Sequence, residues 1–209
     1  MTTLAPSARR LVLADRVFPR NLVMDIVLVV AGASLVTILA QLTIPLPLVP
    51  ITGQTLAVLL VGSTLGWARG GLSMVLYALL GLIGIPVFAP NSDGSHTAGP
   101  GVIFGATGGY IVGFILSAVL VGWLAERQWD RKFLKALATF AAGTLSVFVI
   151  GLPWLAVFAH LDFASTLNYG LVPFLIPGAI KALIAAGLLP LAWFGANKLA
   201  KRRDSSQLD

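Results

Sequence analysis

Long apolar stretches recur along the chain, and short segments rich in charge, proline or glycine separate them. A helix needs roughly 20 apolar residues to cross a bilayer. Stretches near or above this length cover residues 22–43, 52–67, 70–85, 105–125, 134–158 and 173–199. The pattern therefore predicts an all-α polytopic membrane protein, a compact bundle of six transmembrane helices.

Composition supports a single membrane domain. Of 209 residues, 57% are hydrophobic and 11% are charged, whereas soluble domains carry roughly 25% charged residues. Six crossings use about 120 residues at roughly 20 each, which leaves short loops and two basic or polar tails, 1–21 and 200–209. The stretch from residue 22 to 44 is too long for a cleavable signal, so we expect it to be the first span of one domain, residues 1–209.

The basic residues predict the topology. All but one of the 14 Lys and Arg residues fall on one side of the predicted bundle. They are Arg9, Arg10, Arg16, Arg20, Arg69, Arg127, Arg131, Lys132, Lys135, Lys198, Lys201, Arg202 and Arg203. The connections on the other side, 44–51, 86–104 and 159–172, contain no Lys or Arg. The positive-inside rule then places both termini in the cytoplasm.

Lys181 is the exception, because it lies inside the last apolar stretch, about two turns from its external end. A lysine at the centre of a membrane helix costs roughly 2.5–3.5 kcal/mol on insertion scales. The side chain could snorkel to the external head groups. Alternatively, it could sit in a protein-lined cavity that receives an anionic or strongly polar ligand. The last stretch contains no acidic residue to neutralise it, and we favour the cavity.

Other candidate binding residues lie toward the external side of the predicted bundle. The polar candidates are Thr52, Gln54, Tyr77, Asn91, Asp93, Thr107 and Tyr110. Apolar walls could come from Phe88, Phe104 and Phe174. The neutral, proline-rich segment IPLPLVPIT at residues 44–52 is typical of backbone that folds back over a site. Each polar residue could instead cap a helix or be solvated in a loop.

Small residues at four-residue spacing allow membrane helices to approach closely. Three such ridges favour a compact bundle: Gly62, Gly66 and Gly70; Gly105, Gly109, Gly113 and Ser117; Gly178, Ala182 and Ala186. The pattern does not distinguish packing within the chain from packing on a partner subunit.

Several function classes are excluded or disfavoured. The chain has no cysteine, which excludes disulfides and thiolate metal sites. It has no Walker or HExxH motif and no acid–base pair within the apolar stretches, so we predict no catalytic residue, no metal site and no cofactor. The lack of membrane carboxylates disfavours an independent ion-coupled carrier. The placement of the basic residues is explained by the predicted membrane topology. The positive charge therefore does not indicate nucleic-acid binding.

Three segments carry a resemblance to a known family: PLPLVPITGQTLAVLLVGSTLG at 45–66, YALLGLIGIPVFA at 77–89 and GPGVIFGATGGYIVGF at 99–114. They resemble the BioY family, the biotin-specific substrate-binding (S) components of energy-coupling factor (ECF) transporters. The resemblance implies a six-helix protein of a prokaryotic plasma membrane that binds biotin near its external face. It also implies a transmembrane scaffold subunit and two cytoplasmic ATPase subunits as partners.

The last stretch departs from the family pattern, in which an Asp and a Lys lie one turn apart and touch the ligand. Lys181 matches the lysine, but Gly178 stands where the acidic residue is expected. We hypothesise that Asp93 or Asn91, in the long connection between the third and fourth stretches, replaces part of the lost hydrogen bonding. The departure leaves open an S component for another small vitamin or a biotin precursor.

Reporter fusions test the topology. Alkaline phosphatase folds only where disulfides form, outside the cytoplasm. We expect it to be inactive when it is fused after Asp209 and active when it is fused after Asp162, in the third external connection. A fluorescent protein fused after Asp209 should be fluorescent. An active C-terminal phosphatase fusion would contradict the even number of crossings.

Overall fold

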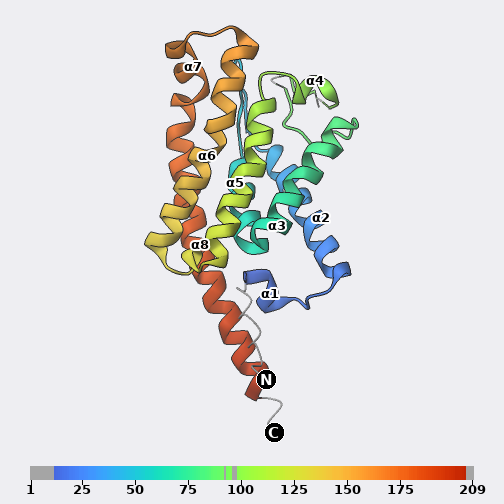
Figure 1. Cartoon of the computed structure of the whole chain (residues 1–209), viewed down its shortest axis with the longest axis vertical. Coiled ribbons are helices and arrows are strands. Elements are labelled where there is room, and N and C mark those ends of the chain that lie inside the picture. The colour runs from blue at the N-terminus through green and yellow to red at the C-terminus, as the bar shows by residue number, and fades with distance from the viewer. Residues whose placement is uncertain (1–11, 92, 96–97, 206–209) are drawn as a thin grey trace, which may run out of the picture.

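The structure is a computed structural model, which describes residues 12–91, 93–95 and 98–205, with side chains as far as residue 198. Long helices dominate it (Figure 1): α2 (Leu22–Ala40), α3 (Gln54–Leu82), α5 (Gly108–Glu126), α6 (Phe133–Ala159) and α8 (Val172–Ser205). The short elements are α1 (Leu13–Val17), β1 (Thr43–Ile44), β2 (Ile51–Thr52), α4 (Pro100–Ile103), the 3₁₀ helix η1 (Trp129–Arg131) and α7 (Phe163–Gly170).

Five helices in the described part of the chain are long and apolar enough to cross a membrane. Helix α3 accounts for the difference from the six predicted stretches, because its backbone leaves the helical region at Gly66, with φ 86° and ψ 175°. Gln54 near its start donates a hydrogen bond to Tyr77 near its end. In a straight helix these residues would be about 35 Å apart. Helix α3 is therefore a hairpin that contains both the second and the third predicted stretches.

Glycines let the two halves of α3 approach each other and α5. A Cβ on Gly70 would lie 3.0 Å from the Cα of Gly62, and a Cβ on Gly62 would lie 2.8 Å from the Ala118 carbonyl oxygen. A Cβ on Gly113 would lie 2.6 Å from the Val147 carbonyl oxygen of α6. The first two predicted ridges thus pack inside this chain.

The outer surface of the bundle is apolar, as lipid contact requires. Leu22 and Val23 of α2 are more than two-thirds exposed, and so are Ile176 and Leu191 of α8. Large exposed apolar side chains on this scale would be unfavourable in water. These observations agree with a protein that crosses the membrane several times.

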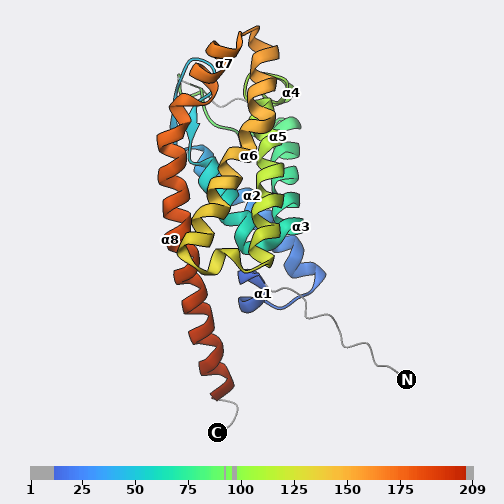
Figure 2. The same ribbon diagram turned by 60° about the vertical axis from the view of Figure 1, so that its left-hand side comes forward.

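An ion-pair network lies at the end of the bundle that carries α1 and the C-terminal part of α8 (Figures 1 and 2). Arg69 pairs with both Asp15 and Asp25, and Asp15 also pairs with Arg20. Burial alone would raise the pKa of Asp15, but the bonds from Arg20 and Arg69 outweigh it and lower that pKa. Val12, which precedes α1, is buried. Part of the predicted basic tail, Leu13–Val17, is therefore a packed helix. The side chains of Arg9, Arg10, Lys201, Arg202 and Arg203 lie outside the described residues.

Asp130 of η1 joins three elements at the same end. Its side chain is fully buried, and its Oδ2 accepts hydrogen bonds from Trp193 Nε1 of α8 (2.7 Å) and Ser63 Oγ of α3 (3.2 Å). Burial raises the pKa of this carboxyl. The contact holds α8 against the first half of α3 near the turn at Gly66.

Substitution of Gly66 tests the hairpin. Its φ and ψ fall in a region that is essentially restricted to glycine and costs other residues about 1–3 kcal/mol. A Cβ there would also lie 2.8 Å from Glu126 Oε1. We expect Gly66→Ala to lower the thermal unfolding temperature of the purified protein.

The matched control is Gly187→Ala in α8, where an added Cβ meets no atom within 4 Å. Alanine is favoured over glycine in a helix, so this control should be neutral or stabilising. Equal effects of the two substitutions would show that the backbone at Gly66 is not constrained.

Candidate functional site

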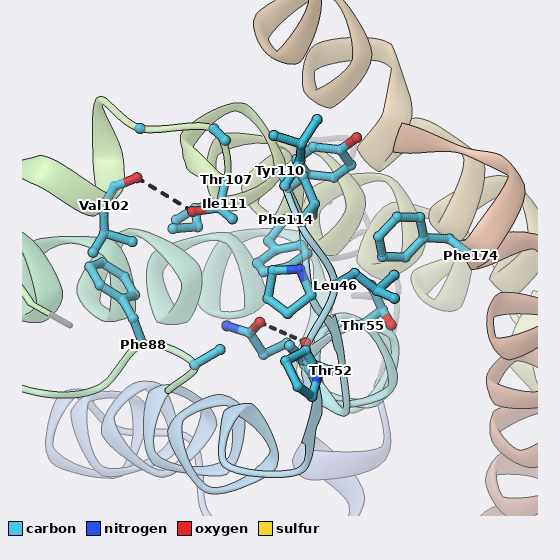
Figure 3. Close-up of a pocket in the computed structure, with 18 of the residues that line it drawn as sticks. Leu46, Thr52, Thr55, Phe88, Val102, Thr107, Tyr110, Ile111, Phe114 and Phe174 are labelled. Atoms are coloured by element: carbon cyan, nitrogen blue, oxygen red, sulfur yellow. Dashed lines mark hydrogen bonds between the residues drawn. The ribbon is translucent and has the colours of Figure 1, made fainter. Parts of the chain in front are cut away.

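A cavity of about 450 Å³, drawn in close-up in Figure 3, is lined in part by α4. Helix α4 lies at the end of the bundle opposite α1 (Figure 1). Its walls come from the β1–β2 hairpin, the start of α3, the segment before α4, and helices α4, α5, α6 and α8. The lining residues are 45–50, Thr52, Gln54, Thr55, Phe88, Ala89, Pro90, Asn91, Ala98, Gly101, Val102, Gly105, Ala106, Thr107, Tyr110, Ile111, Phe114, Val147, Phe148, Phe174 and Lys181.

Lys181 reaches this cavity from α8. Its Nζ donates hydrogen bonds to the Thr52 carbonyl oxygen (2.5 Å) and to Thr55 Oγ1 (2.8 Å). Among the described side chains, no carboxylate lies within ion-pair distance of it. Its ammonium group therefore points into the protein and not toward lipid head groups, which excludes snorkelling. It is a cation held by neutral acceptors.

A chain of polar side chains forms one wall of the cavity. Thr52 Oγ1 donates to Gln54 Oε1 at 2.7 Å, and Gln54 Nε2 donates to Tyr77 OH at 2.5 Å. All three residues are buried, and Tyr77 lies behind Gln54, outside the lining. The Tyr77 hydroxyl thus orients the Gln54 amide at the cavity surface.

Aromatic rings form the facing walls. The rings of Tyr110, Phe148 and Phe174 lie about 6.1 Å apart, centroid to centroid. Tyr110 OH donates to the Gly170 carbonyl oxygen at the end of α7 (2.9 Å). Phe88 lies on another side of the cavity, away from Phe174 (Figure 3). These rings offer flat apolar surfaces to a small molecule.

The proline-rich segment folds over the cavity, as its composition predicted. Thr43 pairs with Thr52 across the short antiparallel ladder, which brings residues 45–50 over the start of α3. Val49 is buried, and Leu46 crosses in front of the cavity in Figure 3. A segment of this kind covers the site without burying unpaired backbone groups in lipid.

The structure brings most of the predicted candidates together. Lining residues among them are Thr52, Gln54, Phe88, Asn91, Thr107, Tyr110, Phe174 and Lys181. Tyr77 supports Gln54 from behind. That these residues bind a ligand stays a prediction.

Besides Tyr77, three candidates lie outside the cavity lining. Asp93 Oδ1 accepts from both the backbone N–H and the hydroxyl of Ser95, which lowers the pKa of Asp93. Phe104 is 64% exposed. A Cβ on Gly178 would lie 3.1 Å from the Thr144 methyl group of α6. These contacts do not favour Asp93 as a substitute for the acidic residue that the family pattern has at position 178. Position 178 itself faces α6.

Several lining residues were not among the candidates from sequence. Ile111 and Phe114 continue the face of α5 that carries Thr107 and Tyr110, at helical spacing of three and four residues. That periodicity was a usable signal. Val147 and Phe148 of α6 gave none, because apolar residues that face lipid and apolar residues that face the cavity look alike in the sequence.

The fold and its site define a polytopic membrane protein with a cavity of small-molecule size near one end of the bundle. Residues 8–198 match the sequence profile of the BioY family. The chain is 37% identical over 160 residues to the biotin transporter BioY2 of Lactococcus lactis, covering 77% of this chain and 85% of that protein. It is 37% identical over 153 residues to the biotin transporter BioY of Thermotoga maritima, covering 73% and 86%. The chain belongs to the BioY family.

A solved structure agrees in fold. The crystal structure of the S-component for biotin from an ECF-type ABC transporter matches with a TM-score of 0.69. The match covers 80% of this chain and 89% of that one, at 24% sequence identity. The predicted all-α membrane fold is thereby confirmed.

Replacing Tyr77 tests the polar wall. In Tyr77→Phe, the buried Nε2 of Gln54 loses its acceptor, and an unsatisfied buried donor costs about 1–3 kcal/mol. We expect a lower thermal unfolding temperature. Tyr169→Phe on half-exposed α7 is the control and should unfold like the wild type. Indistinguishable unfolding of the two variants would contradict a structural role for the Tyr77 hydroxyl.

Proposed function

We propose that this protein is the substrate-binding subunit of an ECF transporter, which captures biotin from the external side of a prokaryotic plasma membrane. A transmembrane scaffold and two ATPase subunits would then drive its release inward. The observation that carries the proposal is Lys181, a partly buried cation without a carboxylate partner among the described side chains, at the wall of the cavity. The names of the relatives supply the identity of the substrate.

The chemistry of biotin fits this cavity. Biotin has an anionic carboxylate, an apolar thioether ring and a neutral ureido group. The Lys181 ammonium has three N–H donors, and two of them meet Thr52 and Thr55. The third can bind the ligand carboxylate in a charge-assisted hydrogen bond. The ring system would then lie against Tyr110 and Phe174.

A ligand anion also offsets the cost of burying the lysine. A buried charge is unfavourable unless it is paired and hydrogen-bonded. In the described part of the chain, neutral oxygens alone stabilise the Lys181 ammonium group. An incoming carboxylate would give the cation a charged partner. Because this pairing offsets the cost of desolvating the cation, it favours the bound state.

The role is that of a transport subunit and not of an enzyme. The sequence has no ATP-binding motif, and the lining residues that the structure describes include no acid–base pair. Energy for uptake would come from the partner subunits, and the whole chain would serve as one membrane domain.

Comparing biotin with its neutral amide, biotinamide, tests the pairing with Lys181. The purified wild-type protein should bind biotin more tightly than biotinamide. In Lys181→Met, biotin binding should weaken by about 10- to 150-fold, the value of a hydrogen bond to a charged group. The preference for the acid over the amide should disappear. Isothermal titration or radiolabelled binding measures all four affinities.

Lys198→Met is the matched control, because it removes an exposed cation from the same helix far from the cavity. It should bind both ligands like the wild type. Unchanged biotin affinity in Lys181→Met would remove this lysine from the site. Stronger retention of desthiobiotin than of biotin would instead indicate a precursor as the substrate. Uptake that does not depend on coexpressed ATPase subunits would indicate a self-contained carrier.

A further inference from the structure

A second hollow lies on the outer surface of the bundle, between α5 and the second half of α3. It has a volume of about 400 Å³, and its lining is entirely apolar: Trp67, Leu116, Val119, Leu120 and Trp123. The α5 residues follow one helix face at spacing of three and four. Trp123 lies one turn before the end of α5, and Trp67 directly follows the turn at Gly66. The groove therefore opens at the basic end of the bundle.

A cation lies directly at the mouth of this groove. The Arg127 guanidinium carbon is 3.4 Å from the centroid of the Trp123 ring. One of its nitrogens donates to the Trp123 carbonyl oxygen. No ion pair joins Arg127 to a carboxylate among the described side chains. The ring thus fixes the guanidinium beside the groove, while further N–H donors remain for an anion.

Most of the charged residues that follow α5 are basic. The first turn of α6 carries Lys135, and the connection from α5 to α6 carries Arg127, Arg131 and Lys132. Its carboxylate, on Asp130, is fully buried and accepts bonds from Trp193 and Ser63. The neighbouring Glu126 accepts from the Trp67 backbone N–H. Clusters of four or more basic residues beside a membrane helix attract anionic lipids.

We propose that this groove binds one anionic glycerophospholipid of the cytoplasmic leaflet. An acyl chain lies between Trp67 and Trp123, and the phosphate group binds Arg127. From Trp123 to Leu116 the groove runs about 10 Å along α5, within the roughly 15 Å hydrocarbon depth of one leaflet. Tryptophan rings are typical of the depth at which head groups meet acyl chains.

The shape of the groove favours a lipid chain over a helix of a partner subunit. Close packing between membrane helices uses small residues on both surfaces. Here two half-exposed tryptophans flank the surface, and a stacked arginine closes one end. A flexible acyl chain can follow such a surface, and a phosphate oxygen meets the guanidinium geometry.

Lipid retention by the purified, detergent-solubilised full chain tests the proposal. Native mass spectrometry would compare phosphatidylglycerol with phosphatidylcholine of identical acyl chains, added in equal amounts. The wild type should retain one phosphatidylglycerol in several-fold preference. Arg127→Gln should lose that preference, and Arg127→Lys, which keeps the charge, should recover most of it. Trp123→Ala should reduce retention of both lipids.

Lys132→Gln is the matched control, because it removes an exposed cation from the same connection, away from the groove lining. It should keep the wild-type preference. Equal losses in Arg127→Gln and Lys132→Gln would overturn the proposal, since general charge would then explain retention. The chain has no cysteine, so Leu120→Cys can carry a unique photo-crosslinker in cell membranes. Crosslinking to lipid supports the proposal, and crosslinking to a transporter subunit overturns it.

Discussion

The hydrogen bonds from Lys181 to Thr52 and Thr55 connect the parts of the protein that enclose the cavity. Through them α8 contacts the end of the β1–β2 hairpin and the first turn of α3. A cation in a membrane bundle needs partners inside the protein because lipid supplies none. These partners are neutral oxygens of the protein. The same interaction therefore helps to hold residues 45–50 over the cavity, and under the proposed function it leaves the charge of the lysine for a ligand carboxylate.

The helices pack closely at one end of the bundle and are held apart at the other end, where the cavity lies. Toward the turn at Gly66, glycines bring the halves of α3 and α5 into backbone contact. Toward the opposite end, the lining changes to Phe88, Tyr110 and Phe174, whose rings keep the elements apart. A small-residue seam at one end and aromatic walls at the other give a bundle that is closed at its basic end and hollow at its neutral end.

The two ends also differ in electrostatics. At the basic end, Arg69 joins two carboxylates, and Asp130 ties η1 to α3 and α8. Cations that are not used in these contacts, such as Arg127 and Lys132, remain at the rim. At the other end the described loops are neutral or slightly acidic and rich in proline and glycine. The basic residues that predict the membrane orientation and the residues that line the cavity thus lie at different ends of the molecule.

Much of the fold of this protein could be predicted from its amino-acid sequence alone. Hydropathy determines the all-α membrane fold, because the cost of burying charge in lipid applies locally to each segment. Charge placement predicts its topology. The same cost singles out Lys181, whatever its neighbours are.

Which partners meet Lys181 was decided only by the tertiary structure. Thr52 and Thr55 are more than a hundred residues away along the chain, and nothing in their local sequence specifies that contact. Likewise, Phe148 and Phe174 face the cavity while other apolar residues of α6 and α8 face lipid. The lipid and much of the cavity wall are both apolar, so hydropathy cannot separate lipid-facing from cavity-facing residues. The Gly66 turn, the inward burial of Asp130 and the orientation of Gly178 toward Thr144 depend in the same way on how the helices pack together.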